Sequence, residues 1–593
     1  MRILGLVAKT HDSGLALLND GIPELILEEE RFNRIKHTHK FPSRSLTAAF
    51  DERGLDLDSV DAVTTPWDVV QLRRTFAHAV GRRFPLSLAL LRQKSHRPQR
   101  NRIVVLNQIL TSELRRHFRT RAVPPIVNVA HHDSHAAVFF ASPFEEAIVL
   151  VMDGYGDVSS ASAYIGRGNR LERIWSTNVF NSLGLVYTFV TEHLGFEGFG
   201  DEGKVMALAA YGSDEYVSRF RDVVRLTPDG GYAVNMDYFD YDAFGQLRPF
   251  KRSFLDTFGP PRARNAAIED RHRDLARALQ VVTEDVVLHI VRHLTRETGL
   301  TNLCMTGGVA LNCVANARIL DDTDVTRIWV PPCASDTGAP LGSALWHHHQ
   351  TLGNPRCFEM THPYYGKSYT EAEIQSALKA AGLSSRRMAP SDLTSRTARA
   401  LADGKVVAWM QGPFEIGPRA LGNRSILADP RRAEMRDILN ARVKKREPFR
   451  PFAPAVLAER AHEFFDISQP DPFMTLAPRV HADKRDLIPA AVHIDGTARI
   501  QTIDRDANPA YHGLIEEFGR ITGVPILLNT SFNRQEPIVA SPADAIACFL
   551  RTEIDILVMG DFFIDERCAH AVQRARHNAT TPNPRRTEAA VVF

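Results

Sequence analysis

A strand, a polar turn and a second strand occur twice near the start of the chain. Residues 3–7 and 15–18 are apolar and flank the turn KTHDSG, and residues 147–169 place the turn DGYGD between two similar segments. Polar glycine-containing turns between apolar runs are typical of β-hairpins. The recurrence indicates two related halves, and two unrelated hairpins are the alternative.

Helical patterns follow these strands. Between residues 275 and 294, apolar side chains recur every three or four positions, which predicts a helix that packs one face on a core. The next segment, TNLCMTGGVALNCVANARI, predicts a short strand, a glycine pair and another helix. Strands that alternate with such helices predict the α/β class. The apolar positions of the first helix are Leu275, Leu279, Val282, Val286, Ile290 and Leu294.

The length of 593 residues requires at least two packed domains. Residues 350–369 are rich in proline and glycine and have no periodicity, so we place the domain boundary there. We expect a first domain over residues 1–355 and a second over residues 370–573. The polar, proline-bearing segment 574–593 predicts a disordered tail.

The overall charge excludes no fold but argues against two classes of partner. Lys plus Arg number 72 and Asp plus Glu number 70, so nothing in the net charge favours nucleic acid or a membrane surface. The opening MRILGLVAKTHDSG lacks the pattern of a signal peptide, and no apolar run reaches the roughly 18 residues that span a bilayer. Six cysteines without a CxxC pair fit reduced thiols. We therefore expect a cytoplasmic protein, and a homodimer remains open.

One segment departs from this balance. Residues 72–122 contain thirteen Lys or Arg and a single acid, Glu113. A local surface for anions or nucleic acid is one interpretation. A solvated helical excursion is the other, and it is favoured because the basic residues are not interleaved with aromatic side chains.

Four residues have the side chains of a mixed-ligand metal site. His131 and His135 are four positions apart and therefore share a face if the segment is helical. Asp153 and Asp336 each stand in a glycine-rich loop after an apolar strand. Imidazoles with carboxylates suit iron, manganese or zinc and do not distinguish between them. The neighbouring His132 is interpreted as a capping or solvent-facing residue.

Three glycine loops are candidates for phosphate binding. Backbone N–H groups at the start of helices bind phosphate where glycine allows a close approach. MTGGVALN, DGYGD and SDTGAP have this form, whereas a P-loop and a GxGxxG motif are absent from the sequence. Each loop by itself is more often a tight turn. The candidate residues are Gly154, Gly307, Gly308, Val309, Asn312 and Gly338.

His11 stands in the first hairpin turn, before Asp12 and Ser13. A histidine with an ordinary pKa near 6.5 suits proton removal from a hydroxyl group. The spacing alone favours a turn histidine that is bonded locally.

The second domain concentrates cations in loops that also contain glycine and proline. Guanidinium groups and hydroxyls in rigid loops bind small oxyanions such as phosphate or carboxylate. A charged surface loop is the weaker alternative, because phenylalanines and prolines are mixed with the charges in KKREPFRPFAP. The candidates are Arg419, Arg424, Lys444, Arg450, Arg499, Thr530 and Ser531.

Seven motifs together resemble those of the ATP-dependent O-carbamoyltransferase family. They are HDSGLALL, HHDSHAA, DEGKVMALAAYG, TGGVALN, GPRALGNRSILADPR, KKREPFRPFAP and LLNTSFN, and they span residues 11 to 540 in order. The family includes tobramycin, novobiocin and cephamycin tailoring enzymes and nodulation-factor carbamoyltransferases. The resemblance implies a duplicated actin-like ATPase (ASKHA) domain followed by a YrdC-like α/β domain.

The resemblance also implies a reaction and a role for each candidate. In the family, carbamoyl phosphate is cleaved to carbamate in the second domain, ATP converts carbamate to carbamoyl-adenylate, and the carbamoyl group passes to a hydroxyl of a natural product or glycan. His11 matches the catalytic base, and His131, His135, Asp153 and Asp336 match the ligands of a metal that is usually iron. Magnesium with ATP is a further expectation. The glycine loops match the nucleotide site, and the cationic loops match the carbamoyl-phosphate site.

Two features depart from the family, and two other functions are retained as alternatives. LNTSFN continues as RQEPIV where the family has a glycine before the glutamate, and residues 72–121 match no family motif. The alternatives are a tRNA-modifying enzyme of the threonylcarbamoyl type and a non-catalytic interaction protein. The expected partner is a small-molecule alcohol and not a nucleic acid.

Overall fold

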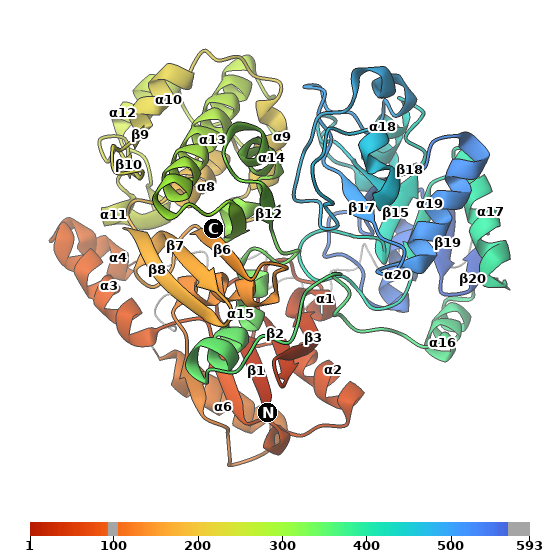
Figure 1. Ribbon diagram of the computed structural model, residues 1–593, viewed down its shortest axis with the longest axis horizontal. Helices are drawn as coiled ribbons and strands as arrows, with labels where there is room; N and C mark the ends of the chain where they lie inside the picture. Colours follow the sequence, from red (N-terminus) through yellow and green to blue (C-terminus); the bar gives the residue numbers. More distant parts are fainter. Residues whose placement is uncertain (93–104, 567–593) are drawn as a thin grey trace. The chain divides into compact units, whose positions relative to one another are not determined.

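The computed structural model describes residues 1–92 and 105–566, which form two compact units (Figure 1). Unit 1 comprises residues 1–30, 37–360 and 475–477, and unit 2 comprises residues 31–36, 361–474 and the described residues from 478 onward. The main division, after Met360, falls inside the proline- and glycine-rich stretch 350–369. The two short exchanged segments were not expected from the sequence. The predicted tail 574–593 lies outside the described residues.

Unit 1 contains two five-stranded sheets of the same topology. The orders are β3-β2-β1-β4-β5 and β12-β11-β6-β7-β8, so each sheet has the order 3-2-1-4-5 when its strands are numbered along the chain. In both sheets the first three strands are antiparallel and the last two run parallel to the first. This repetition confirms the two related halves that the paired hairpins predict. The strands are β1 (Arg2–Val7), β2 (Gly14–Asn19), β3 (Ile22–Glu28), β4 (Ala62–Thr65), β5 (Ile126–Asn128), β6 (Glu146–Met152), β7 (Ser159–Arg167), β8 (Arg170–Asn178), β11 (Asn302–Thr306) and β12 (Arg327–Trp329).

Two short helices bring the halves of unit 1 together. Helix α15 (Ala339–Leu345) packs against β1, β2 and β4 of the first sheet and against α7 (His131–Ala136), which also contacts β6. A Cβ atom at Gly342 would lie 1.8 Å from the carbonyl oxygen of Ser134, so only glycine allows this approach of α15 to α7. The close packing sets the loop before α15 next to the histidines of α7.

The predicted helix at 275–294 is confirmed as part of α13 (Asp270–Thr298), and its apolar positions are buried. A capping box between Glu269 and His272 begins this helix, and Gly299 ends it at φ 71°. Helix α13 packs against α8 (Leu183–His193), α9 (Glu202–Ala209), α10 (Val217–Val223) and α14 (Cys313–Asp322) (Figure 1). In the basic segment, α3 (Val69–Arg82), α4 (Ala89–Arg92) and α6 (Leu106–Phe118) are helical, as the favoured interpretation predicts.

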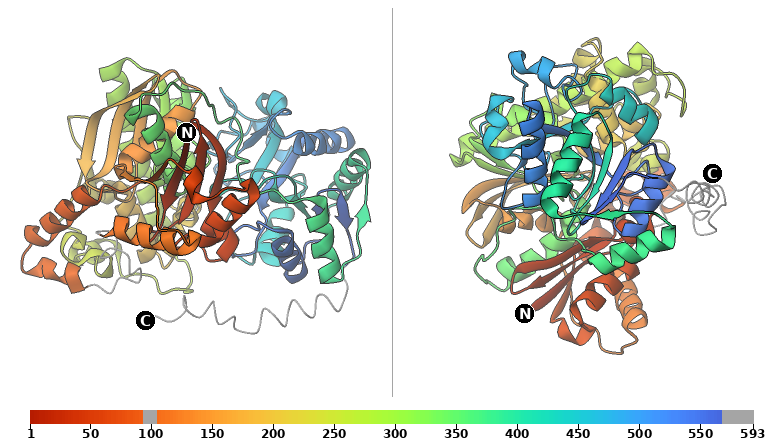
Figure 2. Two further views of the ribbon diagram at one scale, coloured as in Figure 1. Left: turned by 90° about the horizontal axis from the view of Figure 1, so that it is seen from below. Right: turned by 90° about the vertical axis from the view of Figure 1, so that its right-hand side faces the viewer.

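Unit 2 is built on one mixed sheet of eight strands in the order β13-β20-β19-β14-β15-β18-β16-β17. Alternate residues of a strand point to opposite faces, and each face here has its own apolar core. Helices α16 (Glu371–Ala381) and α20 (Pro542–Arg551) cover one face, and α17 (Pro390–Ala402) and α19 (Pro509–Thr522) cover the other (Figure 2). The α/β architecture expected of a YrdC-like domain is thereby confirmed. The strands are β13 (Arg386–Arg387), β14 (Val407–Met410), β15 (Arg424–Ala428), β16 (Ala453–Leu457), β17 (Gln501–Ile503), β18 (Ile526–Ser531), β19 (Ile556–Met559) and β20 (Phe562–Ile564).

None of the helices in the described ranges has the length and apolar content needed to cross a lipid bilayer.

Candidate active site

The four predicted metal ligands meet in unit 1. His131 and His135 lie on α7, Asp153 follows β6, and Asp336 begins the turn (Asp336–Gly338) that leads into α15. Their ligand atoms all lie within 4.8 Å of one another. Nε2 of His131 is 3.3 Å from Oδ2 of Asp153 and 3.4 Å from Oδ1 of Asp336. Nε2 of His135 is 3.3 Å from the same Oδ1. We call these four residues the His/Asp group.

The protein orients these ligands through a second layer of contacts. Nδ1 of His131 lies 3.2 Å from the carbonyl oxygen of Pro66, and the ring of Trp67 stacks on the imidazole at 4.2 Å. The backbone N–H of Gly308 donates to Oδ1 of Asp153 over 2.9 Å. A carbonyl at Nδ1 directs Nε2 toward the group, which is the arrangement that metal-binding histidines commonly have.

The pKa values of His131 and Asp336 depend strongly on the charges of their neighbours in and around the His/Asp group. Burial alone would lower the pKa of His131, but the carboxylates of Asp336 and Asp153 outweigh it and raise that pKa well above its ordinary value. Burial would raise the pKa of Asp336, yet His11 and His131 hold it well below its ordinary range. Two buried carboxylates side by side need positive charge nearby, which a divalent cation supplies. The donor set fits iron, manganese or zinc.

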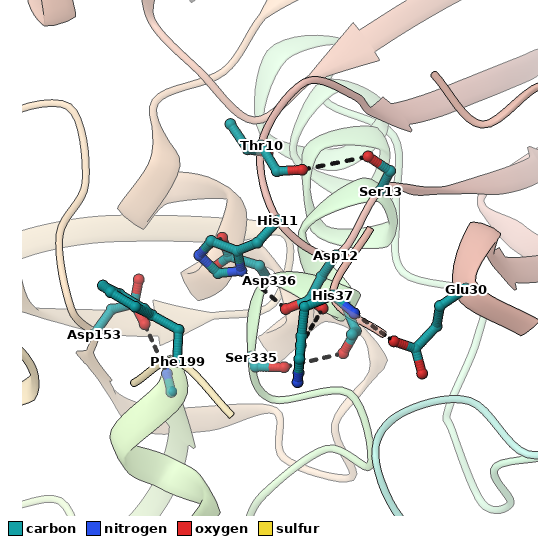
Figure 3. A network of polar contacts seen from close by, with 12 residues as sticks. Thr10, His11, Asp12, Ser13, Glu30, His37, Asp153, Phe199, Ser335 and Asp336 are labelled. Carbon is teal, nitrogen blue, oxygen red and sulfur yellow. Dashed lines mark hydrogen bonds and ion pairs between the residues drawn. The ribbon is translucent and has the colours of Figure 1, made fainter. Parts of the chain in front are cut away.

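His11 contacts the His/Asp group through Asp336. It lies in the turn between β1 and β2, and its Nε2 is 3.4 Å from Oδ2 of Asp336 (Figure 3). Its Nδ1 is 2.9 Å from Oδ2 of Asp12, whose Oδ1 is 2.8 Å from Nδ1 of His37. The backbone N–H of His37 in turn donates to Glu30 over 2.8 Å. His37 and Glu30 were missed in the sequence, where no motif or spacing connects them to His11.

The glycine loops adjoin the His/Asp group, but their members differ in what they contact. Gly154 follows Asp153, Gly338 shares a turn with Asp336, and Gly308 is exposed and donates its N–H to Asp153. Gly307 has φ 89°, and a Cβ there would lie 2.2 Å from the carbonyl oxygen of Met152. Glycine is therefore required where the ends of β11 and β6 approach. Val309 is half-buried in the following turn.

The side chain of Asn312 makes structural hydrogen bonds. Its Oδ1 accepts the N–H of Ala315 at the start of α14, and its amide exchanges hydrogen bonds of 3.0 and 3.1 Å with Gln280. The side chain is thus a helix cap and a helix–helix contact, which differs from the nucleotide role expected from the sequence.

Several positively charged side chains lie near one another in unit 2. Burial lowers the pKa of Arg446 well below its ordinary value, and the charges of Arg450 and Arg499 lower it further. Burial, Arg446, Arg450 and Lys36 act on Lys444 in the same way. Nearby cations that depress one another's pKa values favour the binding of an anion. We call Lys444, Arg446, Arg450 and Arg499 the cationic cluster; Arg446 was not among the predicted binding residues.

The remaining predicted residues of unit 2 have different surroundings. Nζ of Lys444 donates to Ser531 and Asn533, including 3.1 Å to Oγ of Ser531 and 2.9 Å to the carbonyl oxygen of Asn533. Thr530 and Ser531 end β18 and are half-buried, and Arg419 is half-buried in the loop before β15.

The guanidinium group of Arg424, which the sequence predicts to bind an anion, is held by backbone carbonyl groups. It is fully buried, and its Nε and Nη1 donate to the backbone carbonyls of Gln411, Gly412, Asn423 and Ala540. Among its side-chain nitrogens, Nη2 has no hydrogen-bond partner within the described residues.

Comparisons with known proteins agree over most of the chain. Family profiles described as "Carbamoyltransferase N-terminus" and "Carbamoyltransferase C-terminus" match residues 2–345 and 398–566. An uncharacterized protein of Synechocystis is 39% identical, covering 95% of this chain and 96% of its own. Nodulation protein NolNO of Sinorhizobium fredii is 37% identical (94% and 79%), and nodulation protein NolO of Bradyrhizobium diazoefficiens is 42% identical (74% and 79%). The solved (R)-2-hydroxyglutaryl-CoA dehydratase component A of Acidaminococcus fermentans is 12% identical over 59% of this chain and 99% of its own, and its TM-score of 0.31 supports no inference.

Proposed function

The chain belongs to the carbamoyltransferase family, and on that premise we propose that it makes carbamoyl-adenylate from carbamoyl phosphate and ATP and transfers the carbamoyl group to an alcohol. Water first cleaves carbamoyl phosphate to carbamate and phosphate. A carbamate oxygen then attacks the α-phosphorus of ATP, and pyrophosphate leaves. Finally the alcohol oxygen attacks the carbamoyl carbon, the bond to AMP breaks, and the alcohol gives up its proton. The acceptor is a small-molecule natural product or glycan.

One observation carries this proposal: His11 contacts a carboxylate that also contacts both imidazoles of the His/Asp group. Oδ2 of Asp336 faces His11, and Oδ1 faces His131 and His135. A base for the acceptor hydroxyl therefore lies beside the ligands of a cation. His131, His135, Asp153 and Asp336 would hold iron, which when bound offsets negative charge on phosphate oxygens.

His11 is suited to take the proton of the alcohol at Nε2. A proton on Nδ1, donated to Asp12, makes Nε2 the basic atom of the ring, and the Asp336 carboxylate 3.4 Å from Nε2 would stabilise the imidazolium that forms when Nε2 takes the proton. Asp12 also contacts His37, so two histidines fix the direction of its carboxylate. In the glycine loops, the N–H groups of Gly307, Gly308 and Gly338 donate to Ala334, Asp153 and Ser335. The phosphates of ATP and its magnesium complex would have to replace these contacts in order to use the same donors.

The cationic cluster of unit 2 supports the first step. Carbamoyl phosphate carries about two negative charges near neutral pH, as phosphate monoesters do. Arg446, Arg450 and Arg499 are all half-buried, and the charges of Arg450 and Arg499 lower the pKa of Arg446. Such a cluster binds a compact dianion more strongly than a monoanion. We extend the proposal to a cytoplasmic location and to the absence of a nucleic-acid partner.

The test follows pyrophosphate and AMP with the full-length protein, reconstituted with ferrous iron and supplied with ATP. Pyrophosphate release should require carbamoyl phosphate, and an added alcohol should raise AMP release. His131→Ala should lose bound iron and pyrophosphate release together. His132→Asn is the matched control, because His132 lies on the same helix but bonds to Ser162 Oγ at 2.9 Å. Pyrophosphate release that does not depend on carbamoyl phosphate would contradict the proposal. Tight binding of tRNA that weakens as salt is added would favour the tRNA-modifying alternative.

A further inference from the structure

Unit 1 contains a cleft beside the His/Asp group. Of the predicted site residues, only Gly154, which precedes Tyr155, approaches it. It has a cavity volume of about 130 Å³ and is partly open to solvent. Helix α3 contributes Leu72, Phe76 and Ala79, helix α8 contributes Phe189, and Tyr155 comes from the turn after β6.

The cleft borders the candidate active site through two sets of contacts. The ring of Tyr155 is 6.3 Å from that of Trp67, which stacks on His131 at 4.2 Å. A Cβ atom at Gly154 would lie 4.0 Å from Leu185, which lines the cleft, and 3.7 Å from Phe199. The ring of Phe199 is 5.7 Å from that of His11. Gly154, which has no side chain, therefore lies between Leu185 in the wall of the cleft and Phe199, the neighbour of His11.

The lining determines what the cleft can bind. Among the described residues that line it, only Asp242 is charged, and its carboxylate pairs with Arg83 at 2.8 Å. Most of the remaining surface is aliphatic or aromatic. A sugar with many hydroxyls or an aminosugar with several charges would lose hydrogen bonds to water there without replacing them. A ring-bearing apolar molecule would bury its surface against the aromatic side chains.

The cleft also explains the segment that matches no family motif. On α3 the half-buried positions 72, 75, 76 and 79 recur at helical spacing and all line the cleft, whereas Arg73 and Arg74 are exposed. Helices α3 and α11 (Tyr241–Phe244) are in contact (Figure 1), and both contribute residues to the lining of the cleft. One face of this basic helix is therefore an apolar wall.

We infer that this cleft binds the apolar, ring-bearing body of the acceptor alcohol and directs its hydroxyl toward His11. The inference rests on the proposed function and names the substrate class for it: an alcohol on an aromatic or alicyclic scaffold. The transfer step is unchanged, with AMP as the leaving group and the hydroxyl proton passing to the base.

The experiment uses full-length protein and 2-(2-naphthyl)ethanol as the probe. Ala79→Trp fills the cleft from α3, and Ala77→Trp is the matched control because Ala77 is exposed on the same helix. Isothermal titration should give at least a tenfold weaker dissociation constant for Ala79→Trp and no change for Ala77→Trp. Ala79→Leu, which adds less volume, should give an intermediate loss. Pyrophosphate release without alcohol should be equal in all these proteins, since none of the four residues of the His/Asp group lies on α3.

The outcomes separate the inference from the proposed function. Equal binding of the naphthyl alcohol to both Trp variants, or carbamoylation of methyl glucoside in preference to it, overturns the inference while leaving carbamoyl-phosphate-dependent pyrophosphate release intact. A wild-type protein that releases no pyrophosphate contradicts the proposed function and with it the assignment of the cleft to an acceptor. A carbamoyl mass gain on the naphthyl alcohol that Ala79→Trp abolishes supports both.

Discussion

The carboxylate of Asp336 joins His11 to His131: Oδ2 is 3.4 Å from Nε2 of His11, and Oδ1 is 3.4 Å from Nε2 of His131. One side chain therefore contacts both the proposed base and a proposed metal ligand. The position of the base and the geometry of the ligands cannot be changed independently.

Replacement of this carboxylate should damage both functions. Asp336→Asn should lower metal affinity by roughly 10- to 100-fold or more, with parallel losses in pyrophosphate release and in transfer. His11→Asn should lose transfer and keep pyrophosphate release. Metal content by mass spectrometry and the two kinetic assays distinguish these patterns. The control Asp324→Asn changes an exposed aspartate of the same unit, and a metal loss there would count against a specific effect.

Asp12 should act by orienting His11. It has φ 60°, a conformation that asparagine also tolerates, so Asp12→Asn keeps the backbone and removes the charge opposite Nδ1. We expect a fall in kcat for transfer of roughly 10- to 100-fold, with adenylation unchanged. Adding Asp12→Asn to His11→Asn should cost nothing more, because the residue acts through the base. An additive loss in the double variant would show that Asp12 has another role.

Arg499 and Arg450 should determine the affinity for carbamoyl phosphate. Arg499→Ala should raise the KM for carbamoyl phosphate by roughly tenfold or more, since a charge-assisted hydrogen bond contributes about 1.5–3 kcal/mol. The KM for ATP should not change. Arg499→Lys should recover part of the loss, and Arg505→Ala, outside the cluster, should behave as wild type. An equal rise in both KM values would rule out a dedicated site.

Stability should fall in acid because of buried neutral histidines. Burial lowers the pKa of His193 and of His349 to about 4, against an ordinary value near 6.5 in the unfolded chain. Between these values the unfolded state binds more protons, so the free energy of unfolding decreases as pH falls from 6.5 to 4. Each histidine contributes on the order of 3 kcal/mol to this loss.

His193→Phe tests that slope. Phenylalanine preserves the ring contacts with Phe250 and Phe254 and removes the titrating group. Urea unfolding at pH 6.5, 5.5 and 4.5 should show a shallower decline for this variant than for wild type. His78→Phe, at an exposed position, should keep the wild-type slope, and identical slopes for all three proteins would refute the role of His193.

Local patterns predicted the elements that local forces determine. The apolar periodicity at 275–294 gave α13, and Thr370, Glu373 and Gly382 mark the start and end of α16 as a capping box and a left-handed C-cap do. The segments VVAWM, APAVL, PILLN and IDILVM are short apolar runs, a composition typical of strands, and they contain β14, β16, most of β18 and β19.

Contacts between distant segments were not predictable in this way. HxxxH spacing in a chain with 23 histidines is weak evidence, and Asp336 was a candidate only because it stands in a glycine-rich loop after an apolar strand. Nothing local connects His37 to Asp12 or places Trp67 on His131. Glu415 is another example: it is fully buried and accepts the N–H groups of Leu421, Asn423 and Arg424, which orders the loop that had been interpreted only through its arginines.

The exchanged segments 31–36 and 475–477 have a consequence for recombination. Residues 31–36 belong to unit 2 although unit 1 flanks them in sequence, and residues 475–477 belong to unit 1 although unit 2 flanks them. A crossover after residue 360 would therefore separate both segments from the residues they fold with. Chimaeras of two relatives joined at that point would combine an N-terminal parent's residues 31–36 with another parent's second half. Exchange of halves by a single crossover therefore requires these two short stretches to be compatible with the other parent as well.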